Sequence, residues 1–389
     1  MIDFENTQIA FQSKSDKELS KAFKLYKVLS HSSLLKMGKG MTKAAMAIGF
    51  PINWAVKPTI YSLFVGGETI EECKPVVEHL GKFGVKAILD YSVEGKEDES
   101  DMEKALEETL KSVKNAGADP NIPFSVFKPT AFGNSEVLEK VSKGEKISDS
   151  EQKSYDNFVR RIELLCKTAY EADIPILIDA EDVHYQQCID DISEQMMIKY
   201  NKEKAVVFNT WQMYRHDRLE HLKQTYKKAE AGNYFLGAKF VRGAYMERER
   251  ALAKRLGLES PIYPTKQATD DGYNAALKFS IDHIDRMAIF NGTHNEESSL
   301  LLAKWMDEKG MDRKDNRVWF SQLYGMSDHI SFNLANAGFN VAKYLPYGPV
   351  KHVLPYLFRR AEENTSAGQQ AGREITFIMK EMERRKLLK

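Results

Sequence analysis

The sequence predicts an α/β protein built around a (β/α)8 barrel, and two observations support this fold class. Eight apolar runs follow one another along the chain, and each ends in polar or charged residues. The stretches between neighbouring runs carry mixed charge, and several have helical spacing, as in residues 151–172. This alternation is typical of a parallel sheet with helical crossovers. Eight repeats without the signature of a second domain favour a closed barrel over an open doubly wound sheet.

The first four predicted strands cover residues 85–91, 123–128, 174–181 and 205–212. The remaining four cover residues 235–242, 287–295, 318–322 and 339–344. In such barrels the carboxyl ends of the strands meet at one rim, which carries the chemistry. Solvation explains one polar residue at a strand end, but not a polar residue at every one. We therefore expect one rim to present Asp90, Lys128, Asp179, Gln212, Arg242, His294, Gln322 and Tyr344.

Two regions are predicted: an N-terminal helical arm over residues 1–80, and over residues 81–389 a barrel of the TIM type, regular or distorted, with a final helix over its active site. Residues 21–49 contain six lysines and no acidic residue, interleaved with leucines and methionines. A basic amphipathic stretch of this kind can lie on an anionic bilayer surface. The alternative is an arm packed on the barrel with a lysine-rich outer face, and both interpretations stay open.

Composition indicates a soluble catalytic protein. The chain has 389 residues, 42% of them hydrophobic, and its formal net charge is zero, so no overall field favours nucleic acid. Three cysteines without paired spacing fit a reducing compartment rather than a disulfide framework. The longest apolar stretch is interrupted by Gly49, Pro51 and Asn53, so we expect no spanning helix. A cytoplasmic protein is predicted, with peripheral contact to the inner face of a membrane left open.

The last predicted strand leads through Tyr347-Gly348-Pro349 into a helical segment that carries Arg359 and Arg360, with Glu363 one turn further on. The planar guanidinium fork offers parallel donors to both oxygens of a carboxylate. The pair therefore predicts a clamp for a small anionic substrate. The alternative is that these two arginines lie on a surface helix and are simply hydrated by solvent.

Other chemistries leave weaker signals. Residues 38–43 complete neither a dinucleotide-binding glycine motif nor a P-loop. We predict no metal, because a barrel hydrolase commonly has a His-x-His pair that this chain lacks; the metal ligands considered were Asp179, Glu181, His184 and His294. A Schiff-base aldolase on the same barrel remains an alternative, with Lys128, Lys239 and Lys343 as candidate nucleophiles. The second alternative is an inactive binding protein without a flavin.

Five motifs together resemble the proline dehydrogenase family. They are Ile178-Asp179-Ala180-Glu181, Val241-Arg242-Gly243-Ala244-Tyr245, Thr293-His294-Asn295, Tyr344-Leu-Pro346-Tyr-Gly348 and Arg359-Arg360-Ala-Glu-Glu363-Asn364. The resemblance extends over residues 87–364, and the length is similar to the family's single-function form. It implies FAD-dependent oxidation of L-proline to 1-pyrroline-5-carboxylate, the first step of proline catabolism, with a quinone as electron acceptor.

The resemblance also implies roles for individual residues. Arg359, Arg360 and Lys128 hold the substrate carboxylate, Glu363 lies near the amine, and Tyr344 packs against an unsubstituted ring. The complete set of implied substrate-site residues is Lys128, Asp179, Tyr245, Leu323, Tyr344, Arg359, Arg360 and Glu363. The implied FAD-binding residues are Gln212, Lys239, Arg242, Gly243, Ala244, Thr265, Lys266, His294 and Asn295. Lys239 departs from the arginine of several relatives, which puts in doubt which group faces flavin N5.

Overall fold

The computed structural model describes residues 2–31, 37–38, 40–42, 51–92, 98–366 and 370–388. Contacts divide the chain into two compact units, described separately below. The first consists of Met1–Glu94 together with Gln322–Lys389, and the second of Gly95–Ser321.

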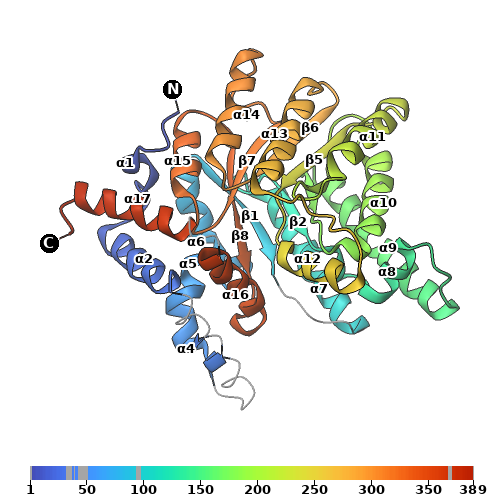
Figure 1. Cartoon of the computed structure of the whole chain (residues 1–389), viewed down its shortest axis with the longest axis horizontal. Coiled ribbons are helices and arrows are strands. Elements are labelled where there is room, and N and C mark those ends of the chain that lie inside the picture. Colours follow the sequence, from blue (N-terminus) through green and yellow to red (C-terminus); the bar gives the residue numbers. More distant parts are fainter. Residues whose placement is uncertain are drawn as a thin grey trace. The chain divides into compact units, whose positions relative to one another are not determined.

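Eight parallel strands occur in the described residues, each followed by helix (Figure 1). The order along the sheet is β1-β8-β7-β6-β5-β4-β3-β2. Their bounds are β1 (Val85–Tyr91), β2 (Ser125–Phe127), β3 (Ile176–Ile178), β4 (Val207–Gln212), β5 (Leu236–Val241), β6 (Met287–Gly292), β7 (Val318–Leu323) and β8 (Val341–Tyr347). This alternation is the (β/α)8 arrangement, which confirms the predicted fold class.

The second unit contains β2–β6, the first part of β7 and eight α-helices among the described residues. The helices are α7 (Glu99–Ala118), α8 (Ser135–Ser142), α9 (Asp149–Glu171), α10 (Val183–Tyr200), α11 (Arg218–Ala231), α12 (Met246–Leu256), α13 (Lys266–Asp282) and α14 (Glu296–Glu308). Helix α9 covers the stretch predicted from spacing, and a capping box of Ser148 and Glu151 begins it. The strands enclose Phe124. Its ring packs edge to face against the rings of Phe208 and Phe290, with ring centroids 5.6 and 5.1 Å apart.

The first unit joins the two ends of the chain. Its helices are α1 (Thr7–Ala10), α2 (Asp16–Leu29), α4 (Asn53–Val56), α5 (Ser62–Phe64), α6 (Ile70–Gly81), α15 (Asp328–Asn336), α16 (Val350–Ser366) and α17 (Gln370–Arg384). Strands β1 and β8 pair in register from Val85↔Val341 to Tyr91↔Tyr347. Leu19 and Tyr26 of α2 share one core cluster with Phe377 of α17. Residues from the N-terminal 80 thus pack against the C-terminal helix.

Helix α2 is amphipathic. It buries Leu19, Ala22, Tyr26 and Leu29 at the spacing of one helical face. Its lysines at positions 17, 21, 24 and 27 are exposed. Lys36, Lys39 and Lys43 of the predicted basic stretch lie outside the described residues. Among the helices that the structure describes, none combines the length and apolarity needed to cross a bilayer.

Candidate functional site

Three predicted site residues converge where β2 and β3 end, beside Lys239 within β5. Asp179 directly follows β3, and its Oδ1 lies 2.5 Å from Nζ of Lys239 on β5. Lys128, which follows β2, has its Nζ 4.0 Å from Oδ2 of the same carboxylate. Lys239 is buried, with 5% of its surface exposed. Two cations therefore share one carboxylate at the end of β3.

Glu181 ties the ends of β2 and β3 together. Its carboxylate accepts hydrogen bonds from the backbone N–H of Thr130 at 2.9 Å and from the Thr130 hydroxyl at 2.6 Å. Burial raises the pKa of Glu181 to about 7, because the hydrogen bonds from Thr130 only partly offset the desolvation of the charge. Thr130 was absent from the predicted site, and its position two residues after Lys128 was the available signal.

Gln212, which ends β4, has an acceptor without a partner among the described residues. Its Nε2 donates to the carbonyl of Glu181 at 2.9 Å. Its Oε1 is buried and has no hydrogen-bond partner within the described parts of the chain. A buried polar atom without a partner is uncommon in native proteins and requires an explanation. A ligand that donates a hydrogen bond here would satisfy it.

A second group of predicted residues gathers around Asp270 on α13. Arg242, which follows β5, donates to Asp270 Oδ1 at 2.8 and 2.6 Å and to the Thr293 hydroxyl at 2.6 Å. Lys266 donates to Asp270 Oδ2 at 2.6 Å. Burial would raise the pKa of Asp270, but the hydrogen bonds from Lys266 and Arg242 outweigh it and hold that pKa below its usual range. The structure thus brings Arg242, Lys266 and the start of the Thr293-His294-Asn295 motif together.

The remaining predicted flavin residues lie at turns and helix starts. Gly243 has a φ of +131°, and a Cβ there would approach the Tyr214 ring to 2.5 Å, so only glycine fits. Ala244 is exposed, and His294 is half-buried. Thr265 and Asn295 cap α13 and α14 by accepting from the N–H of Ala268 at 3.1 Å and of Ser298 at 2.9 Å.

Five of the predicted substrate residues belong to the first unit. Tyr344 lies on β8, and its carbonyl accepts from the N–H of Tyr324, the residue after Leu323, at 2.9 Å. Arg359 is half-buried on α16, and the guanidinium of Arg360 lies 5.2 Å from the centre of the Tyr356 ring. Helix α16 also contains Glu363, whose side chain lies outside the described part. Lys128, Asp179 and Tyr245 belong to the second unit, with Tyr245 at the start of α12. The full carboxylate clamp therefore stays a prediction.

Lys343, a candidate nucleophile of the aldolase alternative, is not at a strand end. Strand β8 continues to Tyr347, and Lys343 is completely buried inside it. Its ammonium group pairs with Asp328 at 2.9 Å and donates to the carbonyl of Met326 at 2.5 Å. A lysine held in this way has a structural role and offers no surface to a carbonyl substrate.

Comparisons with known proteins agree with the motifs. A family model described as "Proline dehydrogenase" matches residues 73–373. Proline dehydrogenase 1, mitochondrial, of Dictyostelium discoideum is 31% identical over 430 residues, covering 99% of this chain and 75% of that protein. The chain belongs to the proline dehydrogenase family. Proline dehydrogenases are FAD-dependent flavoenzymes, so this chain is an oxidoreductase, as its motifs predict.

Two further relatives are similar over most of their length. A carbapenem antibiotics biosynthesis protein of Pectobacterium carotovorum subsp. carotovorum is 37% identical over 326 residues, 84% of each chain. A hydroxyproline dehydrogenase of Xenopus laevis is 31% identical over 412 residues, covering 96% of this chain and 88% of that protein. The family therefore includes proteins named for different substrates, which bears on the selectivity of this proline dehydrogenase homologue.

A solved structure supports the fold. Proline utilization A of Bdellovibrio bacteriovorus, inactivated by N-propargylglycine, superposes with a TM-score of 0.72 at 19% identity over 92% of this chain. This chain spans 38% of that protein's length. Within the proline dehydrogenase fold, the residues present fit an FAD: Gln212 offers a buried acceptor with no partner in the described residues, and the Gly243 turn admits no side chain.

Proposed function

We propose that this chain oxidises L-proline to 1-pyrroline-5-carboxylate and passes the electrons to a quinone. FAD supplies the hydride acceptor, since no amino-acid side chain can take a hydride from the carbon next to the proline nitrogen. One observation carries the proposal most directly. Lys128 and Lys239 both pair with the carboxylate of Asp179. Nearby, the backbone carbonyl of Glu181 accepts a hydrogen bond from the side-chain amide of Gln212.

The ammonium groups of Lys128 and Lys239 are donors that suit the carboxylate of an amino acid. In our proposal Lys128 contributes one contact to that carboxylate, and Arg359 and Arg360 contribute bidentate contacts. Fixing the carboxylate fixes the ring, which orients the reacting C–H bond before the chemical step. Glu363, Asp179, Tyr245 and Leu323 complete the proposed substrate site.

FAD would be held by Gln212, Lys239, Arg242, Gly243, Ala244, Thr265, Lys266, His294 and Asn295. The acceptor of Gln212 and the ammonium of Lys239 are both buried, so each interacts strongly with a ligand in the absence of competing water. A buried cation stabilises negative charge that develops on a reduced cofactor. Thr265 and Asn295 begin helices, whose first N–H groups favour phosphate.

We infer that proline is preferred to hydroxyproline, although a similar protein is named for hydroxyproline. Tyr344 is buried, with 8% of its surface exposed, and its ring would pack on an unsubstituted proline ring. An added hydroxyl would lose its hydration on packing against the buried Tyr344 ring, which lowers affinity.

The quinone acceptor calls for contact with a membrane. The exposed lysines of α2 and the exposed Met37, Met41 and Trp54, which are 58%, 66% and 71% accessible, would support a peripheral contact with an anionic bilayer. We propose this contact for the inner face of a membrane.

The proposal is tested by mixing the purified flavin-loaded protein with L-proline and a soluble quinone and trapping the cyclic imine product with o-aminobenzaldehyde. We expect one imine per quinone reduced. Quinone reduction with 4-hydroxyproline but not with L-proline would overturn the substrate assignment. Failure of the purified apoprotein to bind FAD would overturn the cofactor assignment and favour the inactive binding protein.

A further inference from the structure

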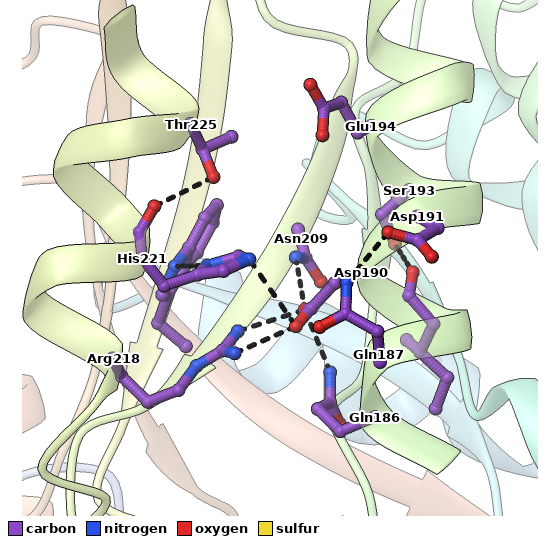
Figure 2. Close-up of polar contacts among 12 residues, drawn as sticks. Gln186, Gln187, Asp190, Asp191, Ser193, Glu194, Asn209, Arg218, His221 and Thr225 are labelled. Atoms are coloured by element: carbon purple, nitrogen blue, oxygen red, sulfur yellow. Dashed lines mark hydrogen bonds and ion pairs between the residues drawn. The ribbon is translucent and has the colours of Figure 1, made fainter. Parts of the chain in front are cut away.

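A buried chain of hydrogen bonds runs from α11 to the cofactor-site residue Gln212, and its first half is drawn in Figure 2. It begins at Arg218, at the start of α11, whose guanidinium pairs with the carboxylate of Asp190 on α10. The two Arg218–Asp190 contacts measure 2.8 and 2.9 Å, and Asn209 of β4 donates to the same carboxylate at 2.9 Å. Both charged residues are 3–4% exposed. Burial would raise the pKa of Asp190, but Arg218 holds it below its usual value, so the carboxylate is ionised.

The ionised carboxylate decides which way Gln186 points. A carboxylate only accepts hydrogen bonds, so the amide of Gln186 must turn its nitrogen toward Asp190, at 3.1 Å. Its oxygen then faces the other way and accepts from the backbone N–H of Glu181 at 2.9 Å. Gln186 is 1% exposed, so water cannot replace either bond.

The hydrogen bonds continue from Gln186 through the backbone of Glu181 to Gln212 in the cofactor site. The N–H of Glu181 is fixed by Gln186, and the carbonyl of Glu181 accepts from Nε2 of Gln212 at 2.9 Å. With its nitrogen committed to this carbonyl, Gln212 presents its oxygen as the buried acceptor described above. Donors and acceptors alternate without a break from Arg218 to that oxygen.

We propose that Gln186 is a positioning residue for the cofactor site, acting through Glu181 to set the amide of Gln212, with Asp190 and Arg218 as its anchor. The inference rests on the proposed function at one point, the assignment of Gln212 to FAD. It adds that the cofactor's affinity depends on a helix residue that does not touch the cofactor. Sequence motifs at the strand ends do not contain Gln186, Asp190 or Arg218.

The test compares the affinity of the apoprotein for FAD in Gln186→Met and in a matched control. Met fills the same space but neither donates nor accepts strongly, so the backbone of Glu181 and the amide of Gln212 lose their fixed positions. We expect the Kd for FAD to rise about tenfold, which is the loss of affinity typical of one buried hydrogen bond. Gln187 is the control: it is exposed, lies on the same helix and makes the same contact one residue further on, to Asp191 at 2.8 Å. Gln187→Met should bind FAD like the unchanged protein.

A double-mutant cycle with Gln212→Met separates positioning from general loss of structure. If Gln186 acts through Gln212, adding Gln186→Met to Gln212→Met should weaken FAD binding by less than twofold. Additive losses would overturn the inference, as would a normal FAD affinity in Gln186→Met when Gln212→Met binds weakly. Normal FAD affinity in Gln212→Met would instead overturn the assignment in the proposed function. Thermal unfolding of the apoproteins identifies a variant that fails to fold, and Gln186→Asn, one methylene too short to reach both partners, then replaces Gln186→Met with the same expectations.

Discussion

Lys239 and Asp179 are separated by 60 positions in the sequence, and their side chains meet at 2.5 Å. The contact exists because β3 and β5 run parallel on either side of β4, in a register that pairs Leu177 with Phe208 and Thr210 with Lys239, so Asp179 comes level with Lys239. Lys128, at the end of β2, shares the same carboxylate. This arrangement of two lysines around one carboxylate underlies the first two predictions.

Replacing Lys128 by Met should raise KM for proline by roughly 10- to 100-fold, the effect of losing one charge-assisted hydrogen bond to the substrate. The flavin content should stay normal, because Lys239 retains its pairing with Asp179. Steady-state kinetics with L-proline measure the change. Lys140→Met, which removes a surface lysine paired with Glu151, is the matched control and should leave KM unaltered. Equal KM values for both variants would contradict the role of Lys128.

Replacing Asp179 by Asn should lower the free energy of unfolding by about 3 kcal/mol, because it takes the ionised partner from the buried ammonium of Lys239. Urea unfolding of the apoprotein measures the loss. Asp282→Asn provides the comparison: Asp282 also contacts a lysine, Lys278, at 2.6 Å, but both side chains are well exposed. That exposed pair should contribute less than about 1 kcal/mol. A loss no larger in Asp179→Asn than in Asp282→Asn would show that the Lys239 charge is compensated elsewhere.

Glu181 should make stability depend on pH. Burial raises its pKa to about 7 in the folded protein, against about 4.3 in an unfolded chain. The folded state therefore binds the proton more tightly, so the contribution of Glu181 is complete below about pH 4.3 and is lost as the pH rises through 7. The expected difference between pH 4.5 and pH 8 is about 3 kcal/mol. Urea unfolding of the unchanged protein and of Glu181→Gln at both pH values measures it. Two pH profiles of equal slope would show that Glu181 titrates normally.

Replacing Tyr344 by Ser should shift preference toward hydroxyproline. The smaller polar side chain leaves room for a ring hydroxyl and offers it a hydrogen-bond partner. The ratio of kcat/KM for L-proline to that for 4-hydroxyproline should fall by about tenfold, in line with the 1–3 kcal/mol typical of such a contact. An unchanged ratio would remove Tyr344 from the substrate pocket.

Much of the fold follows from the sequence because strand positions leave strong local signals. Strand β1 occupies residues 85–91, as predicted. Strand β8 runs three residues past its predicted end, through Pro346. Proline lacks only the N–H, and Pro346 and Tyr347 still lie opposite Asp90 and Tyr91 of β1, so the pairing continues. Strand β3 is shorter than predicted and covers only Ile176–Ile178.

The candidate site is only partly predictable. The meeting of Lys128 and Asp179 follows from the rule that parallel strands end at one edge, whereas the place of Lys239 within β5 depends on the strand register. The partners supplied by helices do not follow from it, since they depend on which helix face is buried. Gln186–Asp190 and Gln187–Asp191 are twin pairs with identical spacing on α10, and only their burial distinguishes them. Asp270, close to the predicted Thr265 and Lys266 in the sequence, is not among the predicted site residues for the same reason.

The central claim is that fixed cations hold the substrate by its carboxylate. Anaerobic bleaching of the flavin by L-proline and by pyrrolidine, the same ring without the carboxylate, tests it in the unchanged protein and in Arg359→Met and Arg360→Met. We predict that both variants bind L-proline at least tenfold more weakly, while pyrrolidine reduces the flavin at the same slow rate in all three proteins. L-proline binding that is unchanged in both variants would contradict the account.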